Sequence, residues 1–397
     1  MTLHPAPVPE STGPDQIDSE LAVARRAEPV EPEPGEVSEL SFARGLWRLS
    51  GARTSAGNRF SLLIDGPKMF ADMLEAIETA SDEVLLENYI IYDDETGRQF
   101  FDALTRASGR GVRVRVLPDW IGSRRTSSRF WSALRGNDIQ VRVFGRPGLK
   151  PWLGLLPRDH RKQLVIDGRV AFIGGFGLGD PWGLPLPDRS QARPWRDTGV
   201  RMEGPVAGDM RHAFERMWRR AAGEHVSAEP PSRRPMSIDT GEAGLVGIIE
   251  GVPGRMRVER GFHFQAAAAE HSIWIASAYF VPSASEVEAL MLAARDGVDV
   301  RLLVPSRSDH PWIPRITRRM YRRLRRAGVR VFEWQGNMMH AKTSVVDQRW
   351  VRIGSTDMNL LGIAINYELD AVICDVDFGR AAARQYLLDL DRANEIR

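Results

Sequence analysis

The chain of 397 residues is poor in two residue types that often carry structural chemistry. Cysteine occurs once, as Cys374, which excludes an internal disulfide framework and a cysteine-based zinc site and fits a reducing compartment. Of the 54 Lys and Arg residues only four are lysines, at positions 68, 150, 162 and 342. Arginine supplies positive charge almost everywhere else, so each lysine position calls for a specific reason.

Long apolar runs and a strong net charge are absent as well. No uninterrupted apolar stretch approaches the roughly 20 residues that cross a bilayer as a helix. The opening residues "MTLHPAPVPESTGPDQ" lack the basic and apolar regions of a signal peptide, so none is expected. A net charge of +2 excludes a uniformly basic nucleic-acid coat protein. The sequence therefore predicts a protein that is either soluble or held on a membrane surface.

Two Pro-rich segments divide the chain. The core of the first, "EPVEPEPGE", cannot bury apolar surface, and "HVSAEPPSRRPMSIDTGEAG" is typical of a linker. Segments 81–119 and 270–306 resemble each other, since each predicts a strand, an amphipathic helix, a "GV" turn and a β-branched strand. This alternation predicts an α/β fold with two homologous halves. We expect a disordered tail at 1–45, a first half at 46–224, a linker at 225–244 and a second half at 245–397.

A histidine–lysine pair occurs at the same place in both halves. The two copies lie 180 residues apart: His160, Lys162, Asp167 and Gly174-Gly175 match His340, Lys342, Asp347 and Gly354-Ser355. Residues two apart on a strand point to the same side, so each histidine shares a face with its lysine. One copy is explained as well by a polar strand face at a sheet edge. Two copies in a lysine-poor chain favour a functional site.

These residue types suit the cleavage of a phosphodiester. Histidine can be nucleophile or general acid because its unperturbed pKa, about 6.5, lies near working pH, and lysine supplies compact charge for the phosphorane oxygens. Two facing half-sites would place one imidazole on each side of the phosphorus. Gly175 and Ser355 are expected to let backbone and hydroxyl donors approach a phosphate. Asp167 and Asp347, in predicted hairpin turns, are expected to have structural or orienting roles. Carboxylates are not clustered at metal-ligand spacing, so neither a metal nor another cofactor is expected.

Two HxKxxxxD motifs, each followed by G-G or G-S, resemble the signature of the phospholipase D superfamily. The resemblance covers roughly residues 58–375. Within it "LLENYIIYDDETG", "GVRVRVLPDWIGS" and "PWRDTGVRMEGP" resemble bacterial cardiolipin synthases of the short branch without transmembrane helices. This implies two phospholipase D-like halves, each a mixed β-sheet flanked by helices, packed face to face about a pseudo-two-fold axis with one shared active site.

The resemblance also implies a reaction. A phosphatidyl group would pass from phosphatidylglycerol, through a phosphohistidine, to the hydroxyl of another molecule. His160 is expected to be the nucleophile and His340 the acid and later the base. Each would be oriented by an acid downstream of the opposite motif, for which the candidates are Asp197 and Glu368; the alternative for both is a surface salt bridge. The protein would work peripherally at the cytoplasmic face of the cell membrane, without an obligate protein partner.

The chain departs from the family pattern at two positions. The family usually has an asparagine two residues after the G-G or G-S pair, where this chain has Gly177 and Asp357. Asn359 is the candidate substitute in the second half. The replacements predict altered acceptor specificity or weak activity.

Two segments are candidates for contact with an anionic membrane. A helix expected at 311–328 combines arginines, Arg318 and Arg322 among them, with an apolar stripe formed by Trp312, Ile316, Met320 and Leu324. It could equally bind nucleic acid or be a solvated surface helix. In "GRPGLKPWLGLLPRDHRK" the side chains of Trp152 and Leu155 are expected to dip into the interface, unless the loop is simply buried.

Three alternatives to the transferase stay open. The first is a phospholipase D-type hydrolase, which uses water as acceptor. The second is a nuclease with the same site; the apolar loop before His160 disfavours nucleic acid as partner. The third is a lipid-binding pseudoenzyme, motivated by the two missing asparagines.

Overall fold

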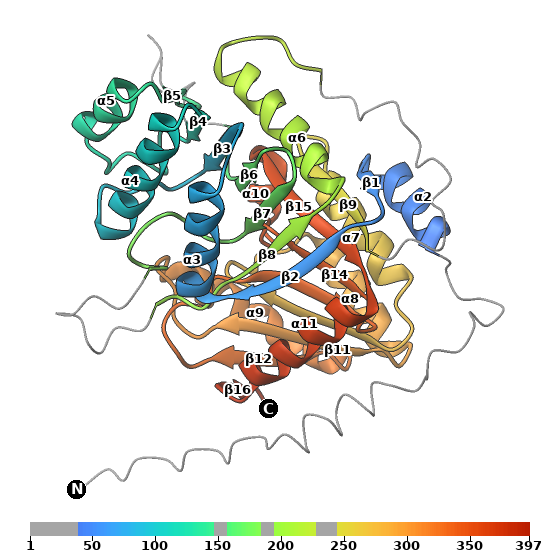
Figure 1. Cartoon of the computed structure of the whole chain (residues 1–397). Coiled ribbons are helices and arrows are strands. Elements are labelled where there is room, and N and C mark those ends of the chain that lie inside the picture. The colour runs from blue at the N-terminus through green and yellow to red at the C-terminus, as the bar shows by residue number, and fades with distance from the viewer. Residues whose placement is uncertain (1–38, 147–156, 184–193, 228–243) are drawn as a thin grey trace, which may run out of the picture.

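The computed structural model describes residues 39–146, 157–183, 194–227 and 244–397. Trp152, Leu155 and most of the predicted linker lie outside these residues, so those expectations stay untested. The described chain forms two mixed sheets of seven and nine strands, flanked by helices (Figure 1). Among the described helices, none is both long enough and apolar enough to cross a membrane.

The seven-stranded sheet belongs to the first half and has the order β2-β8-β7-β6-β3-β4-β5. Its strands are β2 (Arg59–Ile64), β3 (Glu83–Asn88), β4 (Arg113–Pro118), β5 (Gln140–Val141), β6 (Lys162–Ile166), β7 (Val170–Gly174) and β8 (Thr198–Glu203). Helices α3 (Asp65–Glu78), α4 (Glu95–Gly109) and α5 (Ser128–Gly136) cover its outer face. On α4, Phe100, Ala103, Leu104 and Ala107 recur at helical spacing and are buried, which explains why this segment packs on the sheet as a helix.

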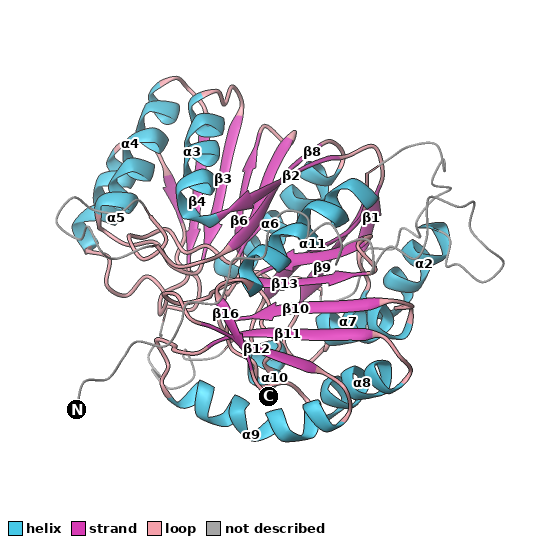
Figure 2. Ribbon diagram, turned by 90° about the horizontal axis from the view of Figure 1, so that it is seen from below, coloured by secondary structure: helices cyan, strands magenta, loops and turns pink. Residues whose placement is uncertain are grey.

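The nine-stranded sheet repeats this order as β9-β15-β14-β13-β10-β11-β12, with β1 and β16 added at its ends. Its strands are β1 (Arg53–Ser55), β9 (Leu245–Gly251), β10 (Ser272–Ser277), β11 (Asp299–Pro305), β12 (Arg330–Trp334), β13 (Lys342–Val346), β14 (Trp350–Gly354), β15 (Glu368–Cys374) and β16 (Ala393–Glu395). Helices α7 (Arg257–Ala267), α8 (Ala284–Arg295) and α9 (Trp312–Arg326) pack on its outer face (Figure 2). The matching strand order confirms the predicted α/β fold of two homologous halves.

The two sheets share one apolar core. Helix α6 (Val206–Ala221) follows β8 and helix α11 (Val376–Leu390) follows β15, and both contribute to the core cluster that contains residues of both sheets. Helix α6 contributes three fully buried side chains to this cluster, Met210, Phe214 and Met217. Helix α11 contributes Ala383, which is fully buried, and Tyr386, which is 3% exposed. Burial of each large apolar side chain contributes roughly 1.5–3 kcal/mol. This common core holds the two motif-bearing sheets in a fixed relation, on which the shared site depends.

The predicted end of the tail, at residue 45, is wrong. Helix α2 (Glu39–Ser50) begins inside it and buries Phe42, Ala43 and Leu46 against the second half, with Phe42 stacked on Trp350 at 4.6 Å between ring centroids. Strand β1 then pairs with β9 of the second sheet. The residues before β2 therefore pack on the second half, although the chain order suggested the first.

The apolar stripe predicted for α9 is correct only at Leu324, which is buried. Ile316 and Met320 are half-buried, and Trp312 is 51% exposed. The face that the helix buries is shifted from the predicted one and is formed by Ile313, Thr317, Tyr321 and Leu324. The exposed side of the helix carries its arginines and Trp312.

Candidate active site

The two histidines are held in place by each other's half of the molecule. His160 precedes β6 and its backbone N–H donates to the carbonyl of Tyr367 at 2.9 Å. His340 precedes β13 and donates in the same way to the carbonyl of Arg196 at 2.7 Å. Both contacts are parts of isolated β-bridges that join the halves. Neither half alone would position its histidine in this way, so the site belongs to the interface.

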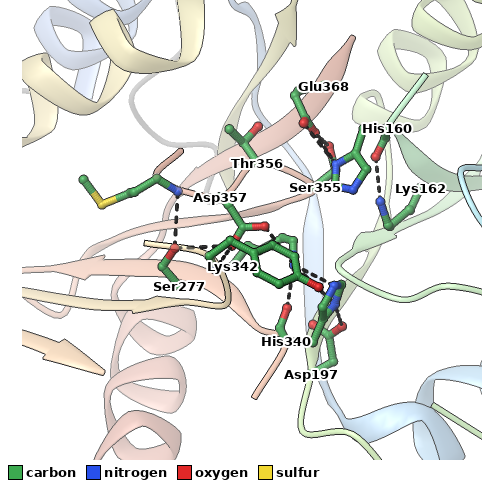
Figure 3. Close-up of polar contacts among 12 residues, drawn as sticks. His160, Lys162, Asp197, Ser277, His340, Lys342, Ser355, Thr356, Asp357 and Glu368 are labelled. Atoms are coloured by element: carbon green, nitrogen blue, oxygen red, sulfur yellow. Dashed lines mark hydrogen bonds and ion pairs between the residues drawn. The ribbon is translucent and has the colours of Figure 1, made fainter. Parts of the chain in front are cut away.

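Each imidazole contacts a buried carboxylate from the opposite half (Figure 3). His160 Nδ1 lies 3.0 and 3.1 Å from the two carboxyl oxygens of Glu368, and His340 Nδ1 lies 2.8 Å from Asp197 Oδ2. Glu368 is 2% exposed and Asp197 is fully buried, which rules out the alternative of a surface salt bridge. A carboxylate on Nδ1 fixes the tautomer of the ring and leaves Nε2 free for chemistry. The structure thus brings together the crossed pairs that the family resemblance implied.

The two lysines repeat the same arrangement. Lys162 Nζ donates to the carbonyl of His160 at 2.7 Å, and Lys342 Nζ donates to that of His340 at 2.8 Å. Each ammonium also lies near a tyrosine ring, Tyr89 at 5.3 Å and Tyr279 at 5.5 Å from the ring centroid. Both lysines lower the pKa of both histidines, so the two ammonium groups and the two imidazoles lie around one space.

Burial controls the protonation of these groups. Desolvation, followed by the nearby lysines, holds the pKa of His160 well below its usual value, and the pKa of His340 is lowered by the same causes. Desolvation raises the pKa of Glu368 to about 8 and that of Asp197 to about 6, and it lowers the pKa of Lys162 to about 8. Burial in the site therefore disfavours the charged form of each of these groups. An anionic phosphodiester would favour the ammonium and imidazolium forms.

The expected roles of Gly175 and Ser355 as phosphate donors are not what the geometry shows. A Cβ at position 175 would come within 2.4 Å of the Asp197 carboxylate, so the glycine makes room for that acid. The hydroxyl of Ser355 donates to Glu368. Both small residues thus support the histidine–carboxylate pairs. The phosphate would be met by the lysines and by the imidazoles themselves.

The two departures from the family pattern have different consequences. A Cβ at Gly177 would collide with the ring of Trp182 at 2.7 Å, and that indole donates to Asp197 at 3.0 Å. Asp357 instead points into the site, with Oδ2 3.2 Å from Lys342 Nζ and Oδ1 accepting the Tyr279 N–H at 2.9 Å. It adds a negative charge where a phosphate would bind.

Asn359 has a structural role at the start of a helix. Its side-chain oxygen accepts the N–H groups of Leu361 and Gly362 at 3.1 and 3.4 Å, so it is the N-cap of the short helix α10 (Leu360–Ile365). Capping uses the side-chain oxygen, whereas a contact with phosphate would use the Nδ2–H donors of the same amide. The suggestion that Asn359 substitutes for the missing asparagine therefore stays a prediction.

The two motif aspartates lie away from the reacting groups. The Asp347 carboxylate accepts the backbone N–H groups of Glu270, His271 and Ser272 at 2.7–2.9 Å. Asp167 makes the equivalent contacts with residues 81–83. Burial alone would raise the pKa of Asp167, but these backbone donors outweigh it and lower the pKa. Both aspartates have positive φ, near 50°, and tie the β-hairpin to the neighbouring strand.

Reasoning from the sequence missed three aromatic residues and one hydroxyl of the site. Tyr89 and Tyr279 contact the lysines and histidines, Trp182 donates to Asp197, and Ser277 donates to Asp357. The tyrosines did leave a signal, because each lies just after the first strand of a repeated segment, Tyr89 directly after Asn88 and Tyr279 one position later relative to Ser277. Nothing in the sequence pattern marks Trp182. Among the described residues, no group of three or more His, Cys, Asp or Glu side chains is placed to hold a metal ion.

Comparison with known proteins assigns this arrangement to a family. The model described as "Cardiolipin synthase, PLD-like domain" matches residues 73–218 and 265–389. Cardiolipin synthase A of Pseudomonas fluorescens is 34% identical over 365 residues, which cover 90% of this chain and 74% of the relative. The major cardiolipin synthase ClsA of Bacillus subtilis is 31% identical over 335 residues, covering 84% and 69%.

Solved structures agree on the fold. The phosphatidylserine synthase of Haemophilus influenzae superimposes with a TM-score of 0.68 over 89% of this chain and 92% of that chain, at 13% identity. The polyphosphate kinase of Porphyromonas gingivalis gives a TM-score of 0.56 at 15% identity, over 85% of this chain and 48% of that one. The paired halves and their shared two-histidine site define an enzyme of the phospholipase D superfamily. Within that superfamily the chain belongs to the cardiolipin synthase family, whose members are phosphatidyltransferases.

Proposed function

We propose that this protein transfers a phosphatidyl group from phosphatidylglycerol to a lipid hydroxyl through a covalent phosphohistidine. The observation that carries the proposal is the crossed pair of buried carboxylate–histidine contacts, His160 with Glu368 and His340 with Asp197. Two oriented imidazoles that face the same space allow one to attack a phosphorus while the other protonates the leaving oxygen on the opposite side. Family membership at about one-third identity supports a phospholipid as substrate.

The reaction would run in two balanced steps. His160 Nε2 attacks the phosphorus, the bond to the glycerol headgroup breaks, and the leaving oxygen takes a proton from His340. The hydroxyl of a second phosphatidylglycerol then attacks the phosphohistidine, gives its proton to His340 and releases His160. Lys162 and Lys342 would stabilise the charge that develops on the non-bridging oxygens in both steps.

The direct test is to incubate the protein with phosphatidylglycerol vesicles in a chelator and to analyse the lipids by mass spectrometry. Cardiolipin and glycerol are the expected products, and His160→Ala should form neither. Phosphatidic acid alone would show that water is the acceptor and would contradict the transferase. Turnover that stops on chelation would contradict the metal-free mechanism.

A lipid-binding pseudoenzyme is the second candidate, and Asp357 is the observation in its favour. The carboxylate next to Lys342 neutralises part of the charge available to a phosphate. In that case the protein would bind phosphatidylglycerol, and wild type and His160→Ala would give the same unchanged lipid profile.

Contact with an anionic membrane is part of the proposal. Helix α9 exposes several arginines, of which Arg322 is one, whereas Arg318 is held by Glu333 at 2.7 Å. Each exposed arginine near an anionic surface would contribute about 1 kcal/mol to binding. We place the enzyme peripherally on the cytoplasmic face of the cell membrane. Arg322→Gln should weaken binding to phosphatidylglycerol vesicles most at low salt, while Arg318→Gln should act mainly through the loss of its ion pair.

A further inference from the structure

Helix α10 stands out among the described surface segments, because all six of its residues, "LLGIAI", lack a polar side chain. Ile363 is buried and anchors the helix. Leu360 and Leu361 are 40% and 66% exposed, and they form the one adjacent pair of exposed large apolar side chains in the part of the chain that the structure describes. Two neighbouring leucines in water are costly unless something covers them.

The position of α10 ties it to the chemistry. The helix follows Ser355 and Asp357 and precedes Glu368, so both of its ends lead into the site. The backbone N–H of Leu360 donates to Val281 at 3.0 Å, two residues after Tyr279, which contacts His340. The exposed leucines therefore lie on the segment that joins two residues of the site, Asp357 and Glu368.

The surroundings of α10 are basic. The carbonyl of Ala364 accepts the N–H of Gly254 at 2.8 Å, which brings the turn before α7 against the helix. That turn carries Arg255, and α7 itself carries Arg260; both are exposed, and the Arg260 guanidinium donates to the Arg255 carbonyl at 2.8 Å. Residues 358–367 contain no acid, and the two acids that flank the arginine segment, Glu250 and Glu259, are buried and bound to Arg161 and Ser283. Apolar side chains next to arginines, without exposed acids in these two segments, match the boundary between acyl chains and anionic headgroups.

We propose that Leu360 and Leu361 enter the acyl region of an anionic bilayer, with Arg255 and Arg260 on the headgroups, so that lipid reaches the site from the membrane. This rests on the proposed function, since it assumes a phospholipid substrate. The charge pattern favours an anionic bilayer over the same surface of a second copy, because residues 358–367 contain no acid and Glu250 and Glu259 are buried, so this surface has no exposed acid to pair with the arginines of a partner copy. Entry of substrate lipid past α10 would also couple membrane binding to the loop that carries Asp357, because that loop leads directly into α10.

The test compares Leu361→Gln with Leu292→Gln, a control at a similarly exposed leucine of α8, 54% exposed. Sedimentation is measured with vesicles of phosphatidylglycerol and phosphatidylcholine, and with phosphatidylcholine alone. Wild type should bind the anionic vesicles more tightly than the neutral ones. Leu361→Gln should lower the partition coefficient about tenfold, the order expected for withdrawing one leucine from an apolar phase, and Leu292→Gln should leave it within about twofold. Arg255→Gln should weaken binding to the anionic vesicles only.

Three results would overturn the inference. Leu361→Gln could bind as wild type does, Leu292→Gln could lose as much binding, or Leu361→Gln could abolish a dimer seen by light scattering, which would make a second copy the occupant. Vesicle binding is read without turnover, so its failure is distinct from a failure of the proposed reaction. Turnover gives an independent readout: Leu361→Gln should lose activity on vesicles relative to dispersed short-chain phosphatidylglycerol, and an unchanged ratio would contradict the docking role.

Discussion

Replacing Glu368 by glutamine should remove most of the activity while leaving the fold intact. The carboxylate lies 3.0 Å from His160 Nδ1, is buried, and accepts a further hydrogen bond from Ser355. At this distance a unit charge pair interacts by about 5 kcal/mol when the effective dielectric constant is about 20. Glutamine keeps the shape but loses the charge that stabilises a phosphorylated imidazole.

The amide oxygen of glutamine can still accept the Nδ1–H of His160 and offsets part of this loss, so we expect kcat to fall by about a thousandfold, with a smaller change in KM. Initial rates of cardiolipin formation from phosphatidylglycerol vesicles measure it. Glu333→Gln is the matched control, because Glu333 pairs with Arg318 at the surface side of the same half, and it should keep kcat within about twofold. A Glu368→Gln enzyme that keeps more than about a third of wild-type kcat would refute the role assigned to the pair.

Three further predictions concern charge and turn structure. The pKa of Glu368 is raised to about 8 and that of Lys162 is lowered to about 8, so kcat/KM should rise as Glu368 ionises and fall as Lys162 loses its proton, which gives a bell-shaped pH profile centred near pH 8. Lys162→Arg should remove the fall on the alkaline side. A Lys162→Arg profile that still falls there would exclude Lys162 as the cause. Asp357→Asn should raise kcat/KM about tenfold by removing a negative charge 3.2 Å from the Lys342 ammonium; a decrease would show that this carboxylate takes part in the reaction. Asp347→Ala should lower the free energy of unfolding by about 3 kcal/mol in urea titrations, because three backbone N–H groups lose their acceptor. An Asp347→Ala protein that is as stable as wild type but inactive would contradict a purely structural role.

The repeat explains why so much of the fold could be predicted. His160 and His340 lie 180 residues apart in segments with the same order of strands and helices, so one alignment of the chain on itself yields both halves. The strand order of the second sheet then copies that of the first. What departs from the repeat was not predicted. Helix α2 and strand β1 pack on the second half because Phe42 and Leu46 fit into its core. The apolar spacing of a helix predicts that one face is buried, but it does not predict which element that face will contact.

The residue types of the site and its crossed histidine–carboxylate pairs could be predicted, but the contacts that support those pairs could not. The motifs identify the histidines and lysines, but the hydrogen bond of Ser355 to Glu368 depends on how β14 and β15 pair. Asn359 was assigned by its nearness in sequence to the missing asparagine, and its role as the N-cap of α10 was not predicted. The apolar stripe of α9 failed for a related reason: the helical period gives a face, but Ile313 and Tyr321 point to the core only in the folded context.

The central claim is that a phosphatidyl group is carried by a histidine of the shared site. It is tested most directly by mixing the enzyme with phosphatidylglycerol, quenching in base, where phosphohistidine is stable, and locating the adduct by peptide mass spectrometry. The account predicts a phosphatidyl adduct on His160, present in wild type and absent from His160→Ala. An adduct on His340 would reverse the roles of the two histidines. Turnover with no adduct on either histidine, at any time before the steady state, would contradict the covalent mechanism itself.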